Sequence, residues 1–228
     1  MNHPTDLILP HGGYRKLRSF VVSLAAYDGT VIFCNRFIDK RSRTNDQMVQ
    51  AARSGVQNIA EGSLASGTSK KTELKLTSVA RASLGELIRD YEDYLRQNRL
   101  LIWDKNSPRV LAMRARLAGN IKRQSDKSDR PDLSDKPDRS EFFDEPLLSA
   151  LRALDTATAE VSANILLCLA HQASFLLGRQ MERLEKDFVE KGGFTERLYQ
   201  YRKEHRGAGS VKEPDHSDLS DWSEKSDF

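Results

Sequence analysis

Two stretches decide the fold of this chain: Asn58-Ile59-Ala60-Glu61-Gly62 and Ala80-Arg81-Ala82-Ser83-Leu84-Gly85-Glu86-Leu87. In each of them, apolar and small residues recur at the spacing of one helix face, with carboxylates beside them. Small side chains let two helix backbones approach closely. The small residues of this region are Ala51, Ala52, Gly55, Ala80 and Ser83. The pattern predicts two packed helices, the first of which ends at Gly62.

The helical spacing continues through most of the chain, and the alternation typical of a strand is missing. It predicts a first helix at residues 14–40, a second that contains residues 48–59 and a third that contains residues 76–95. A weaker helix is expected at residues 107–124, with Ser107 as its N-cap and Pro108 in its first turn. The sequence therefore predicts an all-α protein.

One more long helix is expected after Asp144, which can cap it, and Gly192-Gly193 ends it. Unbroken to residue 191, it would be roughly 65–70 Å long at 1.5 Å per residue. We therefore expect it to overshoot the other helices or to bend near Gly178. A short terminal helix is predicted at residues 195–206.

Charge is segregated along the sequence. Residues 11–124 carry 21 Lys and Arg against 10 Asp and Glu, whereas residues 125–145 carry 4 against 8 and residues 207–228 carry 2 against 6. A basic body thus has two acidic segments.

The acidic segments repeat with a period of three. A carboxylate recurs from Asp126 to Asp138 and again from Asp215 to Asp227, and Asp132-Leu133-Ser134-Asp135 returns as Asp218-Leu219-Ser220-Asp221. This period matches neither a helix nor a strand, and segments with so few aliphatic residues cannot offset the entropy of ordering. Both are predicted to be disordered. The expected organisation is an arm at 1–13, helices within 14–124, an acidic linker at 125–143, helices within 144–206 and an acidic tail at 207–228.

A longer motif runs through the second and third predicted helices. It consists of Gln47, Ala51-Ala52, Ser54 and Asn58-Ile59-Ala60-Glu61-Gly62, followed by Glu73, Ala80, Ser83-Leu84 and Glu86-Leu87. It resembles the four-helix-bundle family that contains the proteins encoded in ribosomal-RNA intervening sequences and the accessory variability proteins of diversity-generating retroelements. The resemblance covers roughly residues 14–103. Residues 175–194 are similar to a C-terminal suffix segment of one branch.

The resemblance implies an antiparallel four-helix bundle with a C-terminal helical extension. It suggests a pentamer and, for one branch, an accessory role beside a reverse transcriptase. Apolar residues wider than one bundle seam also predict a ring-like homo-oligomer, since surplus apolar area marks subunit contacts. These residues include Phe20, Val22, Phe33, Leu100, Ile102, Trp103, Leu166 and Leu167.

Polar residues on the predicted inward faces need partners. We expect a structural network among Asn58, Glu61 and Glu86 with a Lys or Arg. No catalytic residue is predicted, because nucleophile arrangements have no local signature here. No metal or cofactor is predicted either, since a di-iron bundle needs two Glu-x-x-His pairs on its helices, and the sequence has only one, Glu213 and His216, in the acidic tail. The chain is expected not to be an enzyme.

Basic residues are the candidate binding residues. Lys70, Lys71, Lys75 and Arg81 could form a ridge on the third helix, where cations in the first turn are mildly unfavourable without a partner. A second cluster of Arg36, Lys40, Arg41 and Arg43 follows the first helix, where cations also complement the helix dipole.

Two functions remain open at this point. The first is a non-enzymatic oligomeric scaffold that binds structured RNA or an RNA–DNA hybrid through phosphate contacts. The second is a protein-interaction module with no nucleic-acid role, whose basic body engages an acidic protein or its own acidic tail. Neither a signal peptide nor an apolar run long enough to cross a membrane is recognised, so a cytoplasmic location is expected. Cys34 and Cys168 are predicted to be buried reduced thiols.

Overall fold

The structure is a computed structural model that describes residues 13–118, 142–192, 198–199 and 202–203. All regular structure in these residues is helical, which confirms the predicted all-α class. A 3-10 turn, η1 (Tyr14–Lys16), precedes the helices. They are α1 (Arg18–Phe37), α2 (Arg43–Ala65), α3 (Lys70–Gln97), α4 (Pro108–Ala118), α5 (Glu145–Thr156) and α6 (Ala159–Lys191).

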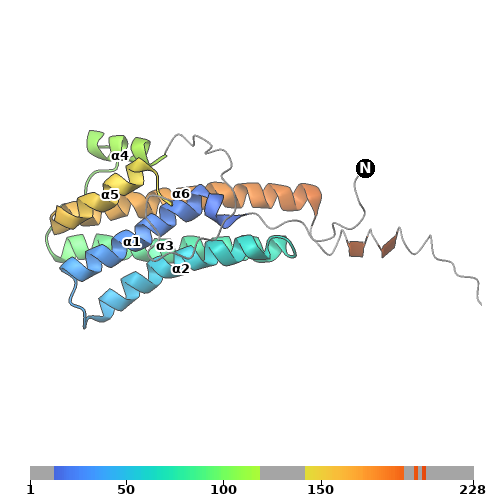
Figure 1. Ribbon diagram of the computed structural model, residues 1–228, viewed down its shortest axis with the longest axis horizontal. Helices are drawn as coiled ribbons and strands as arrows, with labels where there is room; N and C mark the ends of the chain where they lie inside the picture. Colours follow the sequence, from blue (N-terminus) through green and yellow to red (C-terminus); the bar gives the residue numbers. More distant parts are fainter. Residues whose placement is uncertain (1–12, 119–141, 193–197, 200–201, 204–228) are drawn as a thin grey trace, which may run out of the picture.

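Four long helices form the bundle. α1 packs on α2, α2 on α3, α3 on α6 and α6 on α1, and successive members of this ring run in opposite directions (Figure 1). The shorter α4 and α5 lie outside the ring, where α5 contacts α1 and α4 contacts α6. The two extra helices, which follow α3 and precede α6 in sequence, therefore thicken the side of the molecule formed by α1 and α6.

Glycines mark the closest helix approaches. A Cβ at Gly29 of α1 would lie 2.5 Å from Leu166 Cδ2 and 2.9 Å from Leu154 Cδ1. A Cβ at Gly62 would lie 3.3 Å from the backbone oxygen of Glu73. Gly62 does not end its helix as predicted, because α2 continues to Ala65. Its physical role is to let α2 approach the backbone of α3.

The predicted long helix after Asp144 is two helices. The helix is interrupted at Ala157, whose backbone is extended. Thr158 then caps α6, because its hydroxyl accepts a hydrogen bond from the Val161 N–H at 3.4 Å. No bend occurs near Gly178, which lies inside α6. α6 ends at Gly192, whose φ of 66° requires the freedom of glycine. The predicted stop is thus confirmed. The sequence predicted that this helix would overshoot the others or bend, and α6 continues past the loop between α2 and α3 (Figure 1), so the overshoot is the alternative that occurs.

Arg18 of α1 binds the chain on both sides of the predicted acidic linker. Its guanidinium donates a hydrogen bond to the Leu117 carbonyl at 2.8 Å and pairs with the Asp144 carboxylate at 2.9 Å. Asp144 still precedes α5 but makes no side-chain cap. Phe143, predicted to belong to the disordered linker, is buried in the core, so the predicted linker boundary at residue 143 is wrong. The other residues predicted as linker and tail lie outside the described residues, except Phe142, which packs against the core.

α4 confirms the weaker predicted helix over Pro108–Ala118, and residues 119–124 lie outside the described part of the chain. Ser107 caps it, since its hydroxyl accepts from the Val110 N–H at 3.4 Å. Of the predicted terminal helix, residues 198–199 and 202–203 are helical.

A buried amide holds the connection to α4. Asn164 of α6 is 2% exposed, and its Nδ2 donates to the Leu101 carbonyl at 2.8 Å. Its Oδ1 accepts from the Trp103 N–H at 2.9 Å. One side chain thereby ties the segment after α3 to the bundle.

Most of the apolar residues predicted to form subunit contacts are instead buried in the core of the single chain. Phe20, Val22, Phe33, Leu166 and Leu167 are buried, because α5 and α6 cover α1. Ile102 remains 45% exposed.

α6 is long and apolar enough to cross a membrane by length and composition. However, 61% of its most apolar 18-residue stretch is buried inside the protein, as expected for the core helix of a bundle.

Candidate functional site

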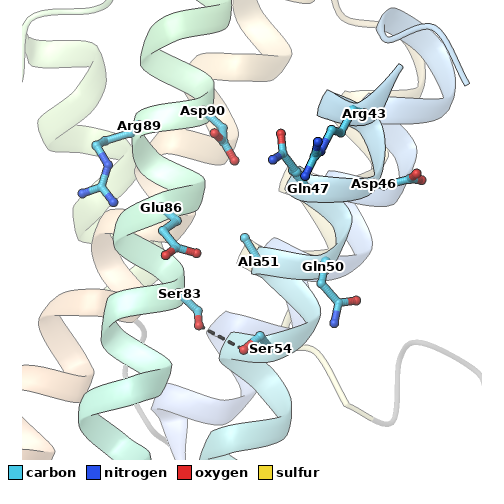
Figure 2. Close-up of a pocket in the computed structure, with 10 residues that line it drawn as sticks. All are labelled: Arg43, Asp46, Gln47, Gln50, Ala51, Ser54, Ser83, Glu86, Arg89 and Asp90. Carbon is cyan, nitrogen blue, oxygen red and sulfur yellow. Dashed lines mark hydrogen bonds between the residues drawn. The ribbon is translucent and has the colours of Figure 1, made fainter. Parts of the chain in front are cut away.

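A polar groove of about 760 Å³ lies between α2 and α3. Figure 2 shows Gln47, Ala51 and Ser54 of α2 facing Ser83, Glu86 and Asp90 of α3 across it. Arg43 stands at its upper end, and Asp46, Gln50 and Arg89 lie at its edges. The groove is open, and its walls are mostly hydrogen-bonding side chains.

A chain of hydrogen bonds closes one end of the groove. The hydroxyls of Ser54 and Ser83 lie 3.0 Å apart, and the Asn58 Nδ2 donates to the Ser54 Oγ at 3.1 Å and to the Ser54 carbonyl at 2.8 Å. Asn58 therefore bonds to Ser54 and to none of its predicted partners, so the predicted network among Asn58, Glu61, Glu86 and a Lys or Arg is wrong for the described residues. Glu61 and Glu86 are exposed and form no ion pair with another described residue. Both face solvent because neither falls on the buried stripe of its helix.

Two carboxylates make one wall of the groove anionic. Glu86 and Asp90 are four residues apart on α3, so they share one helix face. Burial raises the pKa of Asp90, and the nearby charges of Glu86 and Asp93 raise it further, against the opposing effect of Arg89. An arrangement of this kind attracts a cationic group and repels a phosphate.

The groove collects much of the motif that carries the family resemblance, since Gln47, Ser54, Ser83 and Glu86 all line it. The sequence did not single out Asp90 as a site residue. Its four-residue spacing from Glu86 was the available signal, but the partner face on α2 appears only in the folded chain.

The four basic residues of the predicted ridge on α3 differ in their contacts. Lys70 pairs with the buried Glu73 at 2.9 Å. Lys71 and Lys75 are exposed and form no ion pair with any residue the structure describes. Arg81 turns toward α6, where its Cζ lies 3.9 Å from the position of a Cβ on Gly178. Arg81 is also exposed and has no ion pair among the described residues, but of the predicted ridge Lys71 and Lys75 are the cations that lie one turn apart on α3.

The second predicted cluster lies at the opposite end of α2. Arg36 is engaged there, since its guanidinium donates to the Leu154 carbonyl and lies 4.5 Å from the centre of the Phe37 ring. Lys40, Arg41 and Arg43 are exposed. The 23 residues of α2 span about 34 Å, so the two clusters do not form one continuous site.

Cys34 and Cys168 are free and buried, as predicted. Burial, with a smaller contribution from Asp90, raises the pKa of the Cys34 thiol to about 12. This thiol is therefore protonated at neutral pH and is a poor nucleophile. Among the described residues, no group of three or more His, Cys, Asp or Glu side chains could hold a metal ion.

Comparisons with models of protein families, with curated proteins and with solved structures find no match for this chain. Its function must therefore be inferred from the side chains themselves.

Proposed function

We propose that this protein is a non-enzymatic, oligomeric scaffold that binds structured RNA or an RNA–DNA hybrid through phosphate contacts. The observation that carries the proposal is the pair Lys71 and Lys75, exposed one turn apart and without an ion pair in the described chain. The sequence resemblance adds an accessory role beside a reverse transcriptase to the same proposal.

The local electrostatics favour an anionic ligand at this position. Lys71 lies in the first turn of α3, where the positive end of the helix dipole makes a cation unfavourable. A phosphate would relieve this repulsion, because it interacts favourably with both lysines and with the helix dipole. Residues 13–118 also carry 19 Lys and Arg against 10 Asp and Glu, so the surrounding field is positive.

The test is the salt dependence of binding to double-helical RNA. In Lys71→Glu/Lys75→Glu, we expect weaker binding for every RNA sequence and a log affinity–log salt slope smaller by about 1.4–1.8, since each of two neutralised phosphates contributes roughly 0.7–0.9. The control is Arg152→Glu/Lys186→Glu, which makes the same change in net charge at two exposed cations that already have ion-pair partners.

Unchanged binding of the α3 variant at every salt concentration would exclude this surface. Lys40, Arg41 and Arg43 would then be the next phosphate-binding candidates. If changing these residues also has no effect, the protein does not bind RNA through either basic cluster, and the second function takes precedence.

The second candidate is a protein-interaction module with no nucleic-acid role. The groove between α2 and α3 supports it, because Glu86 and Asp90 form an anionic wall beside amide and hydroxyl groups. Such a site fits a basic side chain of a protein partner. Calorimetric titration with an arginine-rich peptide should show binding that Glu86→Gln/Asp90→Asn abolishes, whereas Glu61→Gln should leave it unchanged.

A further inference from the structure

A second groove, of about 700 Å³, lies on the thickened side of the molecule between α4 and α5. Its apolar lining comes from three helices and the segment before α4, and includes Trp103, Met113, Leu117, Pro146, Ala150 and Ile165. This α4–α5 groove is separate from both the polar groove and the lysine pair on α3.

The rim of the α4–α5 groove is cationic. Arg109 and Arg116 of α4 line it and are exposed, and the Arg109 guanidinium lies 3.9 Å from the centre of the Trp103 ring. α4 contains no Asp or Glu. Glu145, the one carboxylate in the lining, pairs with Arg152 at 3.1 Å. An occupant should therefore combine apolar side chains with carboxylates.

Residues 214–228 of the same chain have this chemistry. Between Pro214 and Phe228 there are five Asp and Glu and one Lys, and the large apolar side chains are Leu219, Trp222 and Phe228. We propose that this segment docks in the α4–α5 groove, with Trp222 on the apolar lining and its carboxylates against Arg109 and Arg116. The related stretch at residues 132–135 offers Leu133 but no aromatic side chain, so it fits the groove less well.

The chain is long enough for this contact. From Ile165 in the groove to Lys191 at the end of α6, the helix rises about 39 Å. Leu219 lies roughly 28 residues beyond Lys191. Residues 198–199 and 202–203 within this stretch are helical, and the other 24 can span about 80 Å when extended. The segment can therefore return along α6 to its own groove.

Docking would neutralise the arginines of α4 and bury the apolar lining. It makes the groove a self-binding site that an acidic, tryptophan-bearing partner would have to compete for. The inference is independent of the proposed phosphate site, since Lys71 and Lys75 belong to α3.

Cysteine cross-linking in the full chain tests the proposal. Ser149 is exposed in the groove lining, and Asp221 is next to Trp222, so Ser149→Cys/Asp221→Cys should form an intramolecular disulfide under mild oxidation. The native thiols, Cys34 and Cys168, are buried. The control is Gln57→Cys/Asp221→Cys, which uses an exposed position on α2.

The C-terminal segment is covalently attached to the same chain, so a cysteine at any surface position has some chance of forming a disulfide with one in this segment. The proposal is therefore tested by comparing the rates of disulfide formation in the two variants. We expect at least about a tenfold faster disulfide in the groove pair than in the control, and loss of this excess in Trp222→Ser and at 1 M salt. Equal rates for the two pairs would overturn the proposal. So would a disulfide that links two chains, or a faster reaction of Ser149→Cys/Asp135→Cys, which would assign the groove to the other acidic segment.

Discussion

At the scale of single residues, Gly29 is the tightest point in the core. A methyl group there would meet Leu166 and Leu154, which are both fully buried and have little room to move. We expect Gly29→Ala to destabilise the fold by about 1–2 kcal/mol despite the better helix propensity of alanine, because overpacking typically costs about 1–3 kcal/mol. Urea denaturation measures the change.

Gly85→Ala is the matched control, because a Cβ there has no neighbour within 4 Å. It should stabilise α3 by about 0.5–1 kcal/mol. Equal effects of the two substitutions would mean that the close packing of α1 against α5 and α6 has no energetic consequence.

Asp90 should make stability depend on pH. Its pKa is raised in the folded protein, so the ionised carboxylate destabilises the fold at neutral pH and protonation removes the penalty. Asp90→Asn should therefore have a higher Tm than the parent at pH 7. The difference should shrink as the pH falls through the folded pKa and vanish below the unfolded value of about 3.9.

Glu61→Gln provides the comparison for this series, because Glu61 is exposed, forms no ion pair with another described residue and does not contribute to the raised pKa of Asp90. It should not raise the Tm at pH 7. A parent and Asp90→Asn variant with parallel Tm profiles from pH 3 to pH 7 would contradict the assigned cause.

At the scale of elements, a buried amide holds the segment that leads from α3 into α4. Asn164→Ala removes the hydrogen bonds to the Leu101 carbonyl and the Trp103 N–H, and we expect a loss of about 1–3 kcal/mol with faster amide exchange at Trp103. The control, Asn98→Ala, removes only the exposed bond to the Tyr94 carbonyl. Unchanged exchange at Trp103 would show that other contacts hold this segment.

At the scale of the whole molecule, the proposed ring-like homo-oligomer needs apolar side chains that stay exposed on the single chain. The sequence resemblance suggests that the ring is a pentamer. Leu101, Ile102 and Leu111 are 65%, 45% and 51% exposed, and large apolar side chains exposed together commonly mark a contact surface. Light scattering should give a mass several times 25.8 kDa at micromolar concentration. Ile102→Glu should lower that mass, whereas Val189→Glu, at an 84% exposed position near the end of α6, should not. A monomeric parent would exclude the assembly.

The sequence alone determined the class of the fold, most of its helices and their small-residue contacts. Spacing along a helix is a local property, so Ala51, Ala80 and the stop at Gly192 could be recognised without knowing their neighbours. The break at Ala157 escaped recognition, because an extended residue between two good helices leaves no glycine or proline signal.

Only the tertiary structure decided which polar and charged side chains are exposed and able to bind a ligand or partner. Lys70 and Lys71 are neighbours in sequence, yet one pairs with Glu73 and the other remains exposed. Asp90 and Arg43 line one groove although they lie on different helices. The α4–α5 groove likewise forms between distant segments, which Arg18 and Asn164 help to fasten to the bundle. Such sites depend on which helix faces meet in three dimensions, and no local pattern in the sequence records that pairing.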